Sequence, residues 1–251
     1  MSVVFITGAT SGFGAACVRR FAREGWSVAA TGRKPDLLAA LAAEVAPAPI
    51  HTAVLDVRDK AAVQAAVAAL PAPFAQVDCL VNNAGLALGL DSAWKVDLAD
   101  WETMVDTNIK GLLYCTRALL PGMVERKRGH VINLGSIAGS YPYPGANVYG
   151  ATKAFVKQLS LNLRCELIGA KVRVTDIEPG MADTNFSPTR FKGDTERARK
   201  VYADMSPLTA EDIAEAIFWC ASLPWHVSVS RLELWPTEQA PAFFNVHRDG
   251  Y

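Results

Sequence analysis

Tyr149 and Lys153 stand four positions apart in VYGATKAF, a stretch with the composition of a core helix. Residues i and i+4 lie on one helix face, so both side chains can reach the same pocket. A free tyrosine has a pKa of ~10 and is a poor base near neutrality. A neighbouring ammonium favours the phenolate and moves the tyrosine pKa toward the working pH. The pair therefore predicts a general acid–base; the alternative is a packed tyrosine beside a solvated lysine.

Two other polar residues could join this chemistry. Ser136 ends the apolar stretch HVINLGS, and ligands of open α/β sheets bind outside the carboxyl ends of strands. Its hydroxyl could hold a substrate oxygen while Tyr149 exchanges the proton, although small polar residues are also common in turns. Asn108 interrupts an apolar helical stripe, and a buried amide must find partners. It either serves the site or satisfies a helix kink.

A glycine-rich turn follows the first apolar stretch. VVFITGATSGFG places Gly8, Gly12 and Gly14 between an expected strand and an expected helix. Glycines allow a tight turn and let the backbone approach phosphate oxygens, and a helix N-terminus favours anions. Thr10 and Ser11 offer further hydrogen-bond donors. In the first strand-to-helix turn, this pattern favours a dinucleotide site over a plain loop.

Alternating elements would position these residues. Short β-branched stretches predict strands, and longer stretches with helical periodicity predict helices. Seven strands and six helices alternate, which predicts an α/β, doubly wound, parallel seven-stranded sheet with helices on both faces, a Rossmann fold. The expected strands are 3–6, 27–31, 51–56, 79–85, 130–136, 171–180 and 231–235; the expected helices are about 13–25, 36–45, 59–70, 101–125, 149–167 and 210–222.

The chain is expected to form one domain over residues 1–251, because no linker or repeat divides it. One segment differs from the rest: residues 181–200 are polar, lack clear periodicity and are long for a loop. Such insertions are often lids or binding loops. We expect a substrate-loop insertion at about 181–207.

Composition narrows the class of protein. Twenty-five basic residues balance 25 acidic ones, so no excess charge indicates a nucleic-acid partner. The N-terminus lacks a basic segment typical of signal peptides, and no apolar stretch reaches the ~18 residues that span a bilayer. Five dispersed cysteines indicate free thiols in a reducing compartment, and the four histidines show no metal-ligand spacing. We expect a cytoplasmic protein that binds neither membrane nor metal.

The chain resembles the short-chain dehydrogenase/reductase family over its whole length. The turn at 7–14 matches that family's TGxxxGxG, and NNAG at 82–85 matches the motif after its fourth strand. Ser136, Tyr149 and Lys153 fall at its catalytic positions, and EPG followed by Thr184 resembles its segment beside the nicotinamide. The resemblance implies the catalytic residues Asn108, Ser136, Tyr149 and Lys153, and a homotetramer formed through 101–125, 149–167 and the final helix and strand.

The resemblance also implies the residues that bind the cofactor. Asp56 would accept the adenine amine; the other reading is the N-cap of the next helix, and both can be true. Lys153 would hold the nicotinamide ribose, and Asn108 would support a water that links this lysine to solvent. The implied cofactor-binding set is Gly8, Thr10, Ser11, Gly12, Phe13, Gly14, Asp56, Val57, Asn83, Ala84, Gly85, Tyr149, Lys153, Pro179, Gly180, Met181 and Thr184.

The end of the second strand indicates which dinucleotide binds. NAD sites usually place a carboxylate there for the ribose 2′-hydroxyl, but this strand runs into Gly-Arg-Lys. Arg33, with Lys34, would attract the 2′-phosphate of NADP. The alternative is two solvated basic residues before a helix. We expect NADP.

Within the family, the chain resembles the bacterial NADP-dependent 3-hydroxy acid dehydrogenases. NNAGLALG, DWETMVDTN, NVYGATKAFVKQLSLNLR and RFKG carry this closer resemblance. It implies small substrates such as serine, L-allo-threonine and malonic semialdehyde. The loop MADTNFS departs from the glycine-rich version of that group and borders the substrate pocket. A sulfoacetaldehyde reductase, a reductase of uncharged carbonyls and a non-catalytic NADP sensor are the alternatives.

A substrate carboxylate needs a partner once water is excluded. YPYPGAN at 141–147 carries no charge, whereas NFSPTRFKG carries Arg190 and Lys192. Arg190 could bind a carboxylate bidentately if this loop folds over the pocket. With Ser136 and Tyr149, it completes the expected substrate-binding set; the alternative is a solvated loop arginine.

Overall fold

The computed structural model describes residues 2–184 and 186–241. Its centre is a parallel seven-stranded sheet in the order β3-β2-β1-β4-β5-β6-β7, which confirms the predicted fold. Covered on both faces, its inner strands are continuous apolar stretches. The strands are β1 Val3–Ile6, β2 Ser27–Gly32, β3 Ile50–Val54, β4 Cys79–Asn82, β5 Gly129–Leu134, β6 Val172–Pro179 and β7 Arg231–Leu234.

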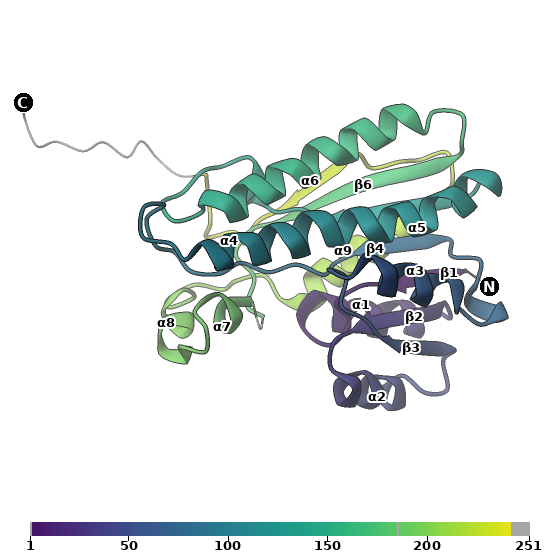
Figure 1. Cartoon of the computed structure of the whole chain (residues 1–251), viewed down its shortest axis with the longest axis horizontal. Helices are drawn as coiled ribbons and strands as arrows, with labels where there is room; N and C mark the ends of the chain where they lie inside the picture. The colour runs from purple at the N-terminus through teal and green to yellow at the C-terminus, as the bar shows by residue number, and fades with distance from the viewer. Residues whose placement is uncertain (1, 185, 242–251) are drawn as a thin grey trace, which may run out of the picture.

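Helices cover both faces of the sheet (Figure 1). α1 and α9 pack together on one face, where α2 also lies, and α3, α5 and α6 cover the other. The helices over the sheet are α1 Gly12–Arg23, α2 Pro35–Glu44, α3 Lys60–Ala68, α4 Leu98–Val105, α5 Leu112–Glu125, α6 Asn147–Glu166 and α9 Ala210–Ser222; the short turns η1 Ala72–Phe74 and η3 Ile137–Gly139 follow α3 and β5.

Alternation along β1 divides the core in two. Val4 and Ile6 face the α1–α9 layer, whereas Val3 and Phe5 face the α3–α5 layer. All four side chains are buried, so this strand anchors the turn that follows it. A rigid strand ending at Ile6 therefore fixes where the glycine-rich turn begins.

The helix expected over 101–125 is present, but it begins earlier, at Leu98, and contains a π-helical turn. α4 ends at Val105, a π-helical turn, η2 Asp106–Gly111, follows, and α5 continues from Leu112. A Cβ on Gly111 would lie 2.6 Å from Val57 Cγ2, so the widened turn packs closely on the loop after β3. π-turns of this kind are frequent at functional sites.

The segment 181–200 is more regular than its sequence predicts. It contains two short helices, α7 Phe186–Arg190 and α8 Thr195–Lys200, which lie together at one end of the molecule (Figure 1). Asp194 caps α8 by accepting a hydrogen bond from the Arg197 N–H. The Asp194 cap and the burial of Ala198 therefore stabilise a helix that the polar composition of the segment does not predict.

Candidate active site

Two adjoining cavities open at the carboxyl edge of the sheet. The smaller, of about 210 Å³, lies over the glycine-rich turn after β1 and reaches Arg33 after β2. The larger, of about 440 Å³, lies over the ends of β5 and β6. Phe13, Asn83 and Thr184 border both cavities. This edge is where ligands of doubly wound sheets bind.

The glycine turn leaves no room for side chains. Gly8 has a φ of +67°, and a Cβ on Gly14 would lie 2.3 Å from the Gly8 oxygen. The Asn83 amide holds the turn by donating to Thr7 O at 2.8 Å and Gly8 O at 3.1 Å. Bare backbone thus faces the smaller cavity beside the N-terminus of α1. This cradle fits the pyrophosphate of the expected dinucleotide.

The far end of the smaller cavity carries charge. Arg33, Asp56 and Val57 line it, whereas Lys34 precedes α2 as its N-cap and is not part of the lining. Sequence reasoning missed Arg58, which grips the Asp56 carboxylate with contacts of 2.6 and 3.0 Å. This hydrogen bond from Arg58 lowers the pKa of Asp56. Asp56 therefore meets the cavity as an ion-paired carboxylate.

The alternative that Asp56 is a helix N-cap is wrong. Asp59 caps α3, because its side chain accepts hydrogen bonds from Ala61 N and Ala62 N. Asp56 lies three residues too early for that helix. It remains placed at the cavity, as the first reading requires.

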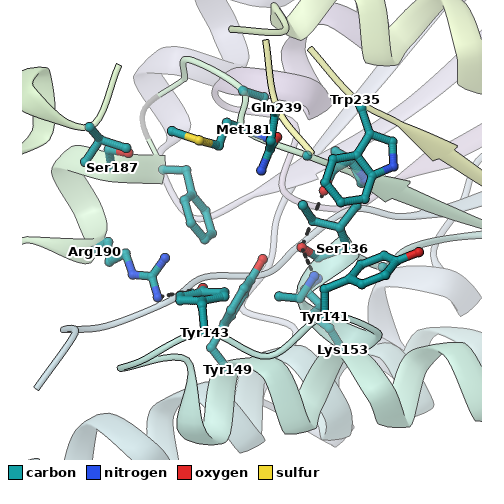
Figure 2. Close-up of a pocket in the computed structure, with 18 of the residues that line it drawn as sticks. Ser136, Tyr141, Tyr143, Tyr149, Lys153, Met181, Ser187, Arg190, Trp235 and Gln239 are labelled. Carbon is teal, nitrogen blue, oxygen red and sulfur yellow. Dashed lines mark hydrogen bonds between the residues drawn. The ribbon is translucent and has the colours of Figure 1, made fainter. Parts of the chain in front are cut away.

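Ser136, Tyr149 and Lys153 come together at the floor of the larger cavity. Figure 2 shows the Tyr149 ring rising from α6 into the cavity, with Ser136 and Lys153 to one side and Arg190 to the other. The Ser136 hydroxyl accepts from Ala138 N at 3.1 Å, which fixes it at the start of η3. The end of β5 and the start of α6 thus place Ser136, Tyr149 and Lys153 in one cavity, as predicted from their positions in the sequence.

The Tyr149 pKa corrects one expectation. Burial raises the pKa of Tyr149 above its ordinary value, and neighbouring Tyr143 adds to this; a hydrogen bond with Ser136 and the charge of Arg190 oppose it. Lys153 does not lower the Tyr149 pKa as predicted. Its ammonium Nζ lies 5.9 Å from the Tyr149 ring centroid and donates to Leu134 O at 2.6 Å. Desolvation outweighs the charges present.

Lys153 is buried beneath the cavity. Burial lowers the pKa of Lys153 to about 8, and the charge of Asp176 opposes that lowering. Its ammonium is held by the Leu134 carbonyl at the end of β5. With a pKa of about 8, Lys153 is mainly an ammonium at neutral pH, but nearby charges can change its protonation in the mildly alkaline range.

Asn108 lies in the π-turn and faces the loop after β4. Its side-chain oxygen accepts from Leu86 N at 2.9 Å, and its amide donates to Leu86 O at 2.8 Å and to Thr152 Oγ1 at 3.1 Å. It thereby ties the π-turn to both the β4 loop and α6. The π-turn and the buried amide are therefore one feature, and the two readings of Asn108 are compatible.

Arg190, at the end of α7, lies in the wall of the larger cavity. Its Nε donates to Gly89 O at 3.1 Å, and Nη2 donates to Tyr143 Oη at 2.9 Å (Figure 2). Its guanidinium carbon lies 5.5 Å from the ring centroids of Tyr143 and Tyr149. This arginine is a fixed cation beside the phenol, and not a solvated loop residue.

Several aromatic residues missed by sequence reasoning line the rest of the wall. They come from the loop after β5, from α7, from the segment after α8 and from the end of β7, segments that no short motif connects. YPYPGAN was the available signal, because its two tyrosines follow the predicted Ser136 turn. The added lining residues are Tyr141, Tyr143, Phe186, Tyr202, Trp235 and Gln239. The expected residues Pro179, Gly180 and Met181 border the same space.

Residues 2–195 match the family described as short chain dehydrogenase. The chain belongs to this family. Two relatives are similar to the chain over nearly their whole length. The NADP-dependent 3-hydroxy acid dehydrogenase YdfG of Salmonella typhi is 57% identical over 247 residues, covering 98% of this chain and 99% of the relative. Sulfoacetaldehyde reductase 2 of Chromohalobacter salexigens is 56% identical over 249 residues, with the same coverage.

A solved structure agrees. The closed form of serine dehydrogenase complexed with NADP+ superposes with a TM-score of 0.97 at 55% identity, covering 98% of this chain and 100% of that one. Like it, the present short-chain dehydrogenase carries the family fold without a large addition. Across residues 2–184 and 186–241, no cluster of potential metal ligands occurs, and no helix has the length and apolar character needed to cross a bilayer.

Proposed function

We propose that the chain is an NADP-dependent oxidoreductase that interconverts a small 3-hydroxy acid and the corresponding semialdehyde or keto acid. The observation that carries this proposal is the meeting of Ser136, Tyr149 and Lys153 beside the fixed guanidinium of Arg190 in the larger cavity. The names of the relatives that share more than half of its residues support it.

The chain's own residues would divide the work as follows. Ser136 would hold the substrate oxygen, and Tyr149 would donate a proton to that oxygen during reduction or remove it during oxidation. Lys153 would stabilise the phenolate that reduction leaves behind. Asn108 would hold the π-turn and the water that returns protons to this lysine. The bound nicotinamide supplies the hydride.

The cofactor would lie along both cavities. The backbone from Gly8 to Gly14, with Thr10, Ser11 and Phe13 between them, would hold the pyrophosphate. Asp56 and Val57 would border the adenine, and Asn83 to Gly85 its ribose. Lys153, with Pro179, Gly180, Met181 and Thr184 opposite, would border the nicotinamide half.

The substrate's acid group would bind Arg190. Most of the cavity wall is aromatic or apolar, so a carboxylate entering it needs a charged partner. Arg190 is already oriented by Gly89 and Tyr143, which lowers the cost of ordering it around an anion.

A sulfonated aldehyde is the second candidate. The same guanidinium can bind a sulfonate, and a sulfoacetaldehyde reductase is among the relatives that match the whole chain. Following NADPH absorbance with malonic semialdehyde, sulfoacetaldehyde and acetone in parallel separates the candidates. If NADPH is consumed fastest with malonic semialdehyde, the chain is a hydroxy acid enzyme. If it is consumed fastest with sulfoacetaldehyde, the chain is a sulfonate enzyme, and if with acetone, a general carbonyl reductase. Consumption with none would favour a non-catalytic NADP sensor.

Replacing Arg33 by alanine is expected to weaken NADP much more than NAD, because only NADP carries the 2′-phosphate. A hydrogen bond to a charged group contributes ~1.5–3 kcal/mol, so the loss for NADP should be roughly tenfold or more. Titrating both oxidised cofactors by intrinsic fluorescence measures it. Lys34→Ala is the matched control, since Lys34 stands outside the cavity lining. Equal losses for NADP and NAD in Arg33→Ala would make Arg33 structural.

We also propose a homotetramer with two-fold interfaces. Leu113 and Leu161, on the long helices α5 and α6, and Trp219 on α9 are large apolar side chains that are at least a third exposed. The apolar tail APAFFNVH, 240–247, would also contribute; its residues 242–247 lie outside the described residues. Static light scattering at micromolar concentration should give four times the chain mass of 27.0 kDa. A monomer would contradict this.

We place the enzyme in the cytoplasm. All five cysteines are free thiols, and Cys17, Cys79, Cys115 and Cys220 are buried, which suits a reducing compartment. Burial raises the pKa of Cys17, so that thiol is unreactive. Fractionation of the native cells would test this.

A further inference from the structure

Two carboxyl groups are buried behind the catalytic site. Asp176 and Glu178 alternate with Ile177 on β6, so both point to the face of the sheet that α6 covers. Asp176 is 1% exposed and Glu178 is fully buried. Acidic residues are almost never buried this deeply unless they are paired. Packing alone does not explain two buried carboxyl groups, so we expect a role in the site beside them.

Asp176 lies directly against the backbone that carries the site. A Cβ on Gly135 would be 2.3 Å from Asp176 Oδ1 and 3.0 Å from its Cγ. The missing side chain of Gly135 is therefore the space that the carboxyl group occupies. On either side of this glycine stand Leu134, whose carbonyl binds Lys153, and Ser136. The carboxyl thus sits behind the turn that joins these two residues.

Three of the pair's four carboxyl oxygens lack a hydrogen-bond donor among the described residues, and the fourth, Glu178 Oε2, accepts from the Ser140 hydroxyl at 3.5 Å. Neither Asp176 oxygen accepts a hydrogen bond from any described residue, and Glu178 Oε1 likewise has only an ion-pair contact, with Arg231 Nε at 3.2 Å. The two side chains are neighbours on one face of β6, so each carboxyl group is exposed to the charge of the other. Two carboxylates repel each other there, whereas a carboxyl and a carboxylate bind through one shared proton.

The charged groups around the pair come from two neighbouring elements. From α6, Lys153 and Lys157 face it, and Lys157 reaches Glu178 through the Ser140 hydroxyl at 2.8 and 3.5 Å. From β7, Arg231 approaches Glu178 and also pairs with Glu233, whose charge in turn acts on Glu178. Glu178 therefore has cationic partners on both sides. Asp176, nearer the site, depends on Lys153 and on Arg231.

We propose that Asp176 and Glu178 hold one proton between them, and that Asp176 is a positioning residue that releases this proton to solvent as the pH rises, so that the Lys153 ammonium keeps its own. The step moves one proton and breaks no covalent bond. It rests on the proposed role of Lys153 in catalysis.

The titration of the groups agrees with this arrangement. Burial and the Glu178 carboxylate raise the pKa of Asp176, while burial lowers the pKa of Lys153 to about 8. Both groups thus titrate in the same range. A negative charge formed at Asp176 raises the pKa of Lys153, so in the proposed order the carboxyl loses its proton first and the ammonium keeps its own.

The two isosteric variants of the pair should move activity in opposite directions. Asp176→Asn cannot form the charge, so Lys153 loses its proton earlier and the alkaline fall in the rate of NADPH-dependent reduction shifts to lower pH. Glu178→Gln removes the competing carboxylate, so Asp176 ionises earlier and the fall shifts to higher pH. A shift of one unit is about a tenfold difference in rate at a fixed alkaline pH. For each variant, the alkaline fall is measured relative to its own rate at lower pH, where the rate does not depend on pH.

Thermal unfolding of the cofactor-free chain gives a second measurement that needs no substrate. A raised pKa means that the folded chain holds a proton that the unfolded chain releases above ~4, the ordinary pKa of aspartate. Stability is then lost as the pH rises from this value toward the folded pKa of Asp176. Asp176→Asn should flatten this loss. The measurement stands even if the chain reduces neither acid nor sulfonate.

Asp78→Asn is the control. Asp78 is a partly buried carboxylate just before β4, at the amino ends of the strands, and it pairs with Arg128 at 2.8 Å. Its variant should leave the alkaline fall in place. The proposal is overturned if Asp176→Asn shows the wild-type alkaline fall, if both pair variants shift in the same direction, or if the pH slope of stability persists in Asp176→Asn. If Asp176→Asn does not fold, the direction of the Glu178→Gln shift decides.

Discussion

Replacing Tyr149 by phenylalanine is expected to lower turnover at least ~10²-fold, the scale of a general acid–base contribution. The change removes only the hydroxyl. The ring would keep its contact with Phe186, whose centroid lies 5.5 Å away, and α6 would keep its packing. NADPH binding should therefore survive while the proton transfer is lost.

Stopped-flow measurement of NADPH oxidation, with NADPH affinity from fluorescence titration, separates the two effects. Tyr114→Phe is the matched control, because Tyr114 lies on α5 and packs in the α3–α5 layer away from the cavities. It should turn over at the wild-type rate. A Tyr149→Phe enzyme with near-normal turnover would remove Tyr149 from the proposed chemistry.

Replacing Arg190 by methionine is expected to raise KM for hydroxy acids by about 10- to 150-fold, which corresponds to ~1.5–3 kcal/mol for a hydrogen bond to a charged group. Methionine keeps much of the side-chain volume against Tyr143 and Tyr149 but carries no charge. The effect should be confined to anionic substrates. An uncharged aldehyde should keep its KM, and the affinity for NADPH should not change.

Lys192→Met tests whether charge in this segment acts through the cavity or from a distance. Lys192 lies two residues further on, pairs with Asp100 at 2.8 Å and is not part of the cavity lining. Its loss should leave KM for both kinds of substrate unchanged. If Arg190→Met harms charged and uncharged substrates equally, Arg190 only shapes the wall, and the acid group binds elsewhere.

The strands were predictable because both of their faces are buried. VVFI is β1, Val3–Ile6, to the residue, since a short apolar stretch bounded by a glycine turn has few other uses. The meeting of Tyr149 with Lys153 was equally accessible, because helical periodicity alone places them on one face. Ser136 followed from the rule that parallel strands deliver ligand contacts at their carboxyl ends.

The misses share a physical cause: each depends on contacts between distant segments. The π-turn at 106–111 forms where Asn108 bonds to Leu86, which no local pattern reveals. α8 is supported by the burial of Ala198 in a polar sequence. The direction of the Tyr149 pKa depended on how far the ring is buried, and helix spacing says nothing of depth.

The bonds between Gly89 and Arg190 have a kinetic consequence. Gly89 N donates to Arg190 O at 2.9 Å while Arg190 Nε donates back to Gly89 O, so a reciprocal pair of hydrogen bonds clasps α7 to the loop after β4. The residue that fastens this clasp is the one that faces the acid group. The expected anion site and this wall of the cavity are thus held by the same two hydrogen bonds. Any movement of α7 away from the β4 loop must break both of them, so we expect such a movement to be slower than that of an unattached loop.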